Sequence, residues 1–193
     1  CVFDSFEVAY PDGSWQPFDG AVELLSLAEL DTLPKALLQR VERLCIVGDT
    51  LIDMEQGDIW EEWADGSDTP TLMFHSWSTD EATPIKYGEG FVTDMSVIAE
   101  LTGLRELRLY AQPLENLNGI QALSELENFT VAYCPALTDA SAAFACPQLR
   151  YLDLHGCPIV SIQGVQNLQD LVELDINDTQ VTDLSLLLEM ERL

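Results

Sequence analysis

Four six-residue segments decide the fold of this chain: LRELRL (104–109), LENFTV (126–131), LRYLDL (149–154) and LVELDI (171–176). They follow one another at steps of 22, 23 and 22 residues. Each segment carries apolar residues at its first, fourth and sixth positions, and another apolar residue lies three positions before it. Self-similarity at a fixed period predicts stacked structural units, because one unit cannot bury its apolar face alone.

A longer match extends this period toward the N-terminus. The segment VTDMSVIAEL (92–101) returns 89 residues later as VTDLSLLLEM (181–190), an offset of four repeat lengths. Counting back from Val92 predicts a degenerate repeat that begins near residue 82, with Ile85-Lys86-Tyr87 as its strand. The series also continues to Met190 and Leu193, so we expect either further repeats or a cap beyond this sequence, or a final coil that is simply short.

The spacing and the phrase VTDLSLL (181–187) resemble the leucine-rich repeat family, in particular its bacterial internalin-type class of 22 residues. The resemblance covers about half of the chain. It implies an α/β solenoid whose short parallel strands, one at each L-x-L, form a concave sheet with both leucines buried. It also implies a ladder of Asn or Cys three residues after each L-x-L. No Asn occurs here, where the ladder positions are Asp49, Gly90, Gln112, Cys134, Cys157 and Thr179.

The residues before the regular repeats predict an irregular N-terminal cap with a hairpin and a helix. Two apolar segments, 6–10 and 14–18, flank Pro11-Asp12-Gly13, which is typical of a tight turn. Residues 33–41 predict a short helix with its proline in the first turn.

The spacing of residues 38–46 predicts an early, irregular coil in which Cys45 points outward. We therefore divide the chain into a cap (1–37), a first coil with an acidic insertion (38–84) and the leucine-rich repeats (85–193).

The insertion combines ten carboxylates, and no basic residue, with an unusual density of aromatic residues between positions 47 and 84. Charge alone indicates a solvated loop, whereas the aromatic residues favour an ordered insertion with residues 72–74 as a strand. Two interpretations remain open. The insertion either packs structurally on the solenoid or binds a partner through Trp60, Trp63 and Trp77.

Net charge limits the partners of this protein. With 8 basic and 34 acidic residues the formal charge is −26, which repels nucleic acid and anionic membrane surfaces and favours basic ligands or cations. The sequence has no stretch of 18 apolar residues, and no basic segment followed by an apolar one opens it. We expect no membrane insertion. We also expect a monomer.

The five cysteines are odd in number, contain no C-x-x-C pair and are not accompanied by histidines at zinc-ligand spacing, which argues against a disulfide framework or a zinc site. The repeat register assigns Cys134, Cys146 and Cys157 to the core, where free cysteine behaves as a small apolar residue. Cys1 invites two interpretations. It is either the lipidated first residue of a mature bacterial lipoprotein or simply the point where the sequence starts.

No nucleotide-binding, zinc-protease, hydrolase or calcium-loop motif occurs in the chain. The two histidines, His75 and His155, have no nucleophile at a motif spacing. We therefore predict no enzymatic activity and no cofactor. An active site within the insertion is the weaker alternative.

Outward positions of the strands form the candidate binding site, because parallel strands about 4.8 Å apart align them in columns. The middle column is Cys45, Lys86, Arg108, Thr130, Asp153 and Asp175. Candidate binding residues on this face are Arg108, Tyr110, Tyr151, Asp153, His155, Glu173 and Asp175.

Charge along this face changes from basic at Arg43, Lys86 and Arg108 to acidic at Asp153, Glu173 and Asp175. A basic or amine-bearing ligand therefore fits the late end, although any strand exposed to water is polar. The three late carboxylates alone make a weak site for a hard cation, so no metal site is predicted.

These features favour a bacterial, extracellular or cell-surface leucine-rich repeat protein that binds another protein or macromolecule without catalysis. The alternative is an intracellular adaptor module, cytoplasmic and part of a longer chain, with which five unpaired cysteines agree equally well.

Overall fold

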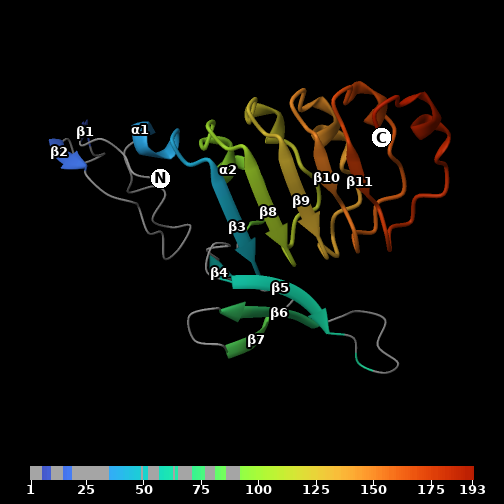
Figure 1. Ribbon diagram of the computed structural model, residues 1–193, viewed down its shortest axis with the longest axis horizontal. Coiled ribbons are helices and arrows are strands. Elements are labelled where there is room, and N and C mark those ends of the chain that lie inside the picture. Colours follow the sequence, from blue (N-terminus) through green and yellow to red (C-terminus); the bar gives the residue numbers. More distant parts are fainter. Residues whose placement is uncertain are drawn as a thin grey trace.

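The computed structural model describes residues 6–9, 15–18, 35–48, 50–51, 57–62, 64, 71–76, 81–85 and 92–193. Within them the chain winds into a solenoid whose parallel strands stand side by side (Figure 1). The strands, in spatial order, are β3 (Arg43–Val47), β8 (Glu106–Tyr110), β9 (Asn128–Ala132), β10 (Tyr151–Asp153) and β11 (Glu173–Asp175). A short antiparallel strand, β4 (Thr50–Leu51), pairs with the outer edge of β3.

The strands are in register along the repeat, as the 22-residue period predicts. One column runs through Arg43, Glu106, Asn128, Tyr151 and Glu173. The next runs through Cys45, Arg108, Thr130, Asp153 and Asp175. The predicted columns are therefore confirmed for these residues.

Short helical turns return the chain along the opposite side of each coil. They are α2 (Ser96–Ala99), η2 (Ile120–Ala122), η3 (Ser141–Ala145), η4 (Val165–Asn167) and η5 (Ser185–Glu189). Among the described residues no helix is both long and apolar enough to cross a membrane.

A polar side chain precedes each of these turns and accepts a hydrogen bond from the backbone N–H two residues later. Such bonds satisfy donors that a helical turn cannot satisfy itself. The acceptors recur at the repeat period as Asp94, Asn116, Asp139, Ser161 and Asp183, with bonds of 2.8–3.1 Å. This role explains the Asp of the repeated VTD phrase.

The core lies between the sheet and the turns and runs through the coils from Leu38 to Leu171. Alternation along each strand buries the residues that the pattern predicts, with Leu152 1% and Leu154 0% exposed. The three cysteines assigned to the core, Cys134, Cys146 and Cys157, are likewise buried.

The four ladder positions that the structure describes bond backbone carbonyls although they lack asparagine. Cys134 donates to Ala132 O, Cys157 to Val131 O and Thr179 to Ile176 O. Gln112, 0% exposed, donates to Gly48 O and Tyr110 O at 2.8 Å and accepts from Val92 N at 3.1 Å. Where the structure describes the residue that precedes a ladder position, this residue has a positive φ: Gly48, Ala111, Tyr133, Gly156 and Asp178.

The first coil differs from its prediction. Ile85 does not belong to a strand of the concave sheet, because β7 (Glu81–Ile85) pairs antiparallel with β6 (Thr71–Ser76). The concave sheet passes directly from β3 to β8 instead. The prediction of a repeat strand at residues 85–87 is therefore wrong, and Lys86 and Tyr87 lie outside the described residues.

The physical reason is an insertion between the strand and the turn of one coil. Val47 and Val92 are separated by 45 residues, whereas their counterparts Tyr110 and Leu114 are separated by 4. The intervening chain contains β5 (Gly57–Glu62), β6 and β7, a separate three-stranded antiparallel sheet. It lies below the carboxyl ends of β3 and β8 in Figure 1. The predicted strand at residues 72–74 is confirmed as part of β6.

At the N-terminus, β1 (Phe6–Ala9) and β2 (Trp15–Phe18) form the predicted antiparallel hairpin. The helix α1 (Lys35–Leu38) is shorter than predicted. The chain after α1 touches the solenoid so closely that a Cβ on Gly103 would lie 2.1 Å from Gln39 O. That the hairpin and α1 cap the solenoid remains a prediction. Cys1 lies outside the described residues.

Candidate interaction surface on the concave sheet

The candidate surface is the outward face of β10 and β11 with the residues just beyond them. Pairing of these strands sets Tyr151 beside Glu173 and Asp153 beside Asp175. We call Tyr151, Asp153, His155, Glu173 and Asp175 the late end of the concave face. Tyr151 is 42% exposed, Glu173 is exposed, and the other three are partly buried.

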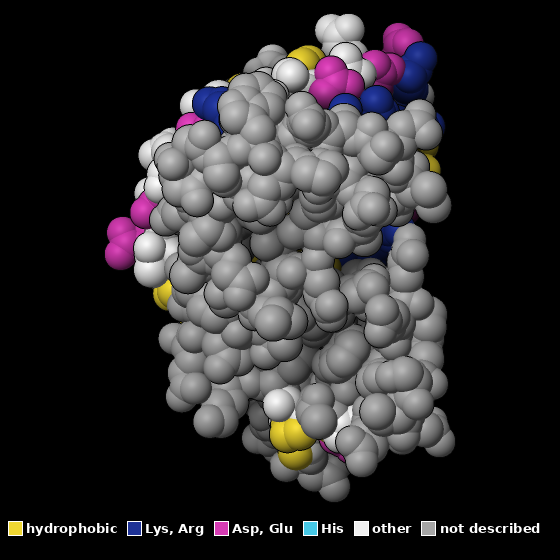
Figure 2. Space-filling view, turned by 90° about the vertical axis from the view of Figure 1, so that its left-hand side faces the viewer, with side chains coloured by type: hydrophobic (Ala, Val, Ile, Leu, Met, Phe, Trp, Pro, Cys, Tyr) yellow, Lys and Arg dark blue, Asp and Glu magenta, His cyan; other side chains and the backbone are white. Residues whose placement is uncertain are grey.

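The early end of the face is less basic than the sequence predicts. Arg43 Nε lies 2.9 Å from Glu106 Oε2, and an Arg108 guanidinium nitrogen lies 2.5 Å from Glu106 Oε1. Both guanidinium groups therefore share one carboxylate, which offsets one of their two positive charges. From the N-terminal end, basic side chains of described residues also stand beside acidic ones along the upper margin (Figure 2).

Tyr110 and Cys45 are withdrawn from water at this end. Burial raises the pKa of the Tyr110 hydroxyl to about 12 and that of the Cys45 thiol to about 12. Cys45 lies on the outward face of β3 as predicted, but it is only 5% exposed. It occupies the predicted middle column beside Arg108.

The late end keeps its negative charge. In the part of the chain that the structure describes, no Lys or Arg forms an ion pair with Asp153, Glu173 or Asp175. Arg150, the nearest basic residue in sequence, stacks over the Tyr151 ring at 5.9 Å from its centroid. The late end therefore combines an exposed aromatic ring with carboxylates that pair with no Lys or Arg of the described residues.

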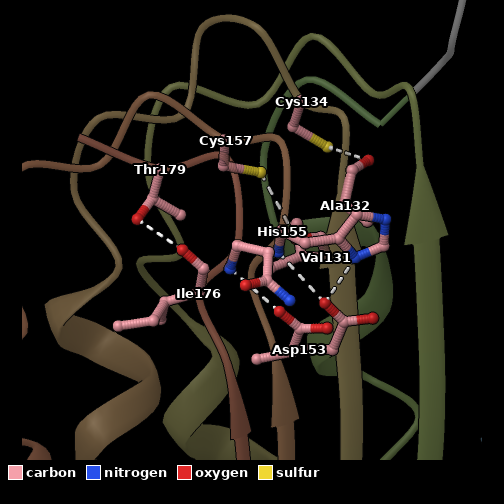
Figure 3. A network of polar contacts seen from close by, with 10 residues as sticks. Val131, Ala132, Cys134, Asp153, His155, Cys157, Ile176 and Thr179 are labelled. Carbon is pink, nitrogen blue, oxygen red and sulfur yellow. Dashed lines mark hydrogen bonds and ion pairs between the residues drawn. The ribbon is translucent and has the colours of Figure 1, made fainter. Parts of the chain in front are cut away.

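His155 is held against Asp153 at the carboxyl end of β10 (Figure 3). Its Nδ1 lies 2.6 Å from Asp153 Oδ1, which also accepts the His155 backbone N–H at 3.0 Å. The Tyr133 ring packs edge-on against the imidazole, with centroids 4.6 Å apart. Gly156 permits this packing because a Cβ there would lie 2.5 Å from the Tyr133 ring.

The group of side chains that could hold a metal ion consists of Asp153, His155 and Asp175, and it does not include Glu173. One potential ligand atom from each of Asp153, His155 and Asp175 lies within 4.8 Å of the other two. Sequence reasoning grouped Glu173 with the two aspartates instead. The signal it missed is the spacing of Asp153 and His155, two residues apart and therefore on one face of a strand.

The pairing of Asp153 with His155 resembles part of a catalytic triad, which requires a nucleophile within reach of the imidazole. Cys157 follows two residues later, but it is 0% exposed and its sulfur donates to Val131 O at 3.3 Å (Figure 3). This thiol is therefore engaged in the ladder and does not face a substrate.

The tryptophans of the insertion are not brought into this surface by any described contact. Trp60 lies in β5, opposite Met73 in β6. Trp63 and Trp77 lie outside the described residues. Their partner-binding role remains a prediction.

A stack of 22- to 23-residue coils, each with one parallel strand, a buried ladder position and a helical return, defines a leucine-rich repeat solenoid. The family pattern for leucine-rich repeats, two copies, matches residues 147–189. Proteins built on this repeat are in general non-catalytic interaction modules.

Among solved structures the chain is similar to two internalins of Listeria monocytogenes. It shares 27% identity with InlF over 53% of this chain and 30% of that one, with a TM-score of 0.49. It shares 22% identity with internalin C2 over 55% of this chain and 46% of that one, with a TM-score of 0.47. The chain thus spans less than half the length of either structure. No curated protein matches it.

Proposed function

We propose that this chain is a non-catalytic binding module that captures a protein, or another macromolecule with a basic patch, on the late end of its concave face. Arg108 and Tyr110 extend this surface toward the early coils. One observation carries the proposal: Tyr151 is exposed beside carboxylates that have no Lys or Arg partner among the described residues.

The physical chemistry of interfaces supports this surface. Tyrosine offers a large, rigid contact area and is enriched among the residues that dominate binding energy. Carboxylates without a Lys or Arg partner attract a basic patch over a distance of about 8 Å at physiological salt. They also orient it, because complementary charge sets encounter rate and register.

The experiment compares capture by the intact chain with capture by Tyr151→Ala, Asp153→Ala and Val160→Ala. Val160 is the matched control, because it is 60% exposed and lies outside the concave columns. Each protein is immobilised and offered cell-surface and cytoplasmic fractions, and bound proteins are quantified by mass spectrometry.

We expect both concave variants to capture at least about 10-fold less of a specific partner, and Val160→Ala to capture as much as the intact chain. Equal capture by all four proteins would exclude this face as the binding site.

The proposal includes a bacterial, extracellular or cell-surface setting, which the resemblance of the repeat motivates. The alternative is an intracellular adaptor. The genomic sequence upstream of Cys1 separates the two, because a signal peptide with a lipidation site supports the first setting and continuous coding sequence supports the second.

A further inference from the structure

We propose that Asp153, His155 and Asp175 form a binding site for a divalent ion of the zinc type on the concave face. These residues offer one imidazole nitrogen and two carboxylates whose ligand atoms lie within 4.8 Å of one another. The site needs no partner protein, so its test is independent of the proposed function.

Strand pairing places the ligands close together. Asp153 and Asp175 are register neighbours on β10 and β11, and His155 follows Asp153 by two residues. Two ligands of a tetrahedral zinc ion, each about 2.0–2.2 Å from the metal, lie roughly 3.4 Å apart. Side-chain rotations that move these atoms by about 1 Å therefore suffice to close the site.

The donor set selects the class of metal. Calcium and magnesium take oxygen ligands, whereas zinc is bound by imidazole nitrogen together with carboxylate oxygen. Two carboxylates also balance the charge of a divalent ion. Three protein ligands leave a fourth position open to water or to a group of a bound partner.

The surroundings of the cluster support binding beyond the donor set itself. The His155 side chain is 17% exposed and is held by the Tyr133 ring and by Asp153, so little freedom is lost on binding. Elsewhere the acidic neighbours of β8 and β9 pair with arginine, as Glu106 and Glu127 do. Among the described residues Asp175 has no such partner, and a metal ion would supply the counter-charge.

The first experiment titrates the intact chain with zinc chloride in an isothermal calorimeter, using Asp175→Asn, His155→Gln and Glu173→Gln as variants. Glu173→Gln is the matched control, because it removes one negative charge from the same strand without removing a ligand. Circular dichroism verifies that each variant is folded.

We expect one zinc ion at this site, with affinity reduced at least about 10-fold in the first two variants and less than about twofold in the control. Unchanged affinity in Asp175→Asn or His155→Gln would overturn the proposal. Equal losses in all three would also overturn it, because they would indicate only diffuse attraction to negative charge.

A second measurement does not depend on replacing a ligand. The chain has two histidines, so a ¹⁵N-labelled His75→Gln variant carries His155 as its single imidazole. Addition of zinc should shift the ring nitrogen resonances of His155. Resonances that stay unchanged at saturating zinc would overturn the proposal, whatever the calorimeter records.

Discussion

At the residue scale, Gln112 shows how one buried polar side chain joins distant parts of the chain. Its side-chain NH₂ group donates to Gly48 O and to Tyr110 O in the next strand, and its side-chain oxygen accepts from Val92 N. Gly48 and Val92 lie at the two ends of the insertion. Gln112 is the only fully buried polar side chain among the described residues. Its three hydrogen bonds therefore hold the insertion's two ends together beneath the sheet.

Replacing Gln112 with alanine removes the partner of the buried Gly48 carbonyl and of the buried Val92 N–H, whereas Tyr110 O still accepts from Gly48 N at 3.0 Å. Since each such group costs about 1–3 kcal/mol, and relaxation recovers part of this, we expect the free energy of unfolding to fall by about 2–3 kcal/mol. Urea denaturation measures the loss.

The control is Gln148→Ala, an exposed glutamine whose removal should change the stability by less than about 0.5 kcal/mol. Similar values for the two variants would show that the hydrogen bonds of Gln112 contribute nothing specific.

At the scale of the element, each helical turn is initiated by the same side-chain bond. In three of the turns the acceptor is an aspartate, and its pKa is lowered by hydrogen bonds from the hydroxyl and the backbone N–H of the serine two residues later. The pairs are Asp94 with Ser96, Asp139 with Ser141 and Asp183 with Ser185. Asn116 makes the same backbone bond without a charge. The position therefore requires an acceptor oxygen and does not require ionisation.

This difference predicts a pH dependence. Because the folded-state pKa of each Asp lies below its unfolded value of about 3.9, the stabilisation is complete above that value and is lost as pH falls through the folded-state pKa. A triple Asp94→Asn, Asp139→Asn, Asp183→Asn variant keeps the acceptor and removes this dependence.

Melting temperatures of both proteins between pH 7 and pH 3 test the prediction. The intact chain should lose stability relative to the variant below about pH 4. Both proteins share all other carboxylates, so the effect of these groups cancels when the two melting temperatures are subtracted. Asn116→Asp should add to the dependence. A difference that stays constant over this range would contradict the prediction.

At the scale of the whole molecule, packing weakens toward the last coil. Leu152 and Leu154 are 1% and 0% exposed, whereas their counterparts Leu174 and Ile176 are only partly buried. In a linear array, the stability of each coil depends on its neighbours, and β11 has a described neighbour on one side alone.

We therefore expect amide hydrogen exchange in β11 to be at least about 10-fold faster than in β9. The comparison is matched, because equivalent amides make equivalent hydrogen bonds in the two strands. Asn128 N donates to Arg105 O, and Glu173 N donates to Arg150 O, in each case the second residue of the preceding repeat segment. Exchange followed by mass spectrometry or NMR reports each segment. Equal protection would show that the solenoid opens as one unit.

The candidate site was predictable in part. Alternation along the strands placed Tyr151, Asp153 and Asp175 outward, because the direction of a side chain depends only on its own strand. The arginine pairs at Glu106 and the cluster around His155 were not predictable, since they depend on which side-chain rotamers meet across neighbouring strands.

By itself the sequence determined the solenoid, its register and the buried faces, because the 22-residue period is local and repeats in every coil. Only the tertiary structure decided that β3 lies beside β8 across the insertion, that Gln112 closes this junction, and that His155 joins the two aspartates. These features depend on contacts between residues far apart in the chain, and their geometry is set by the packed sheet.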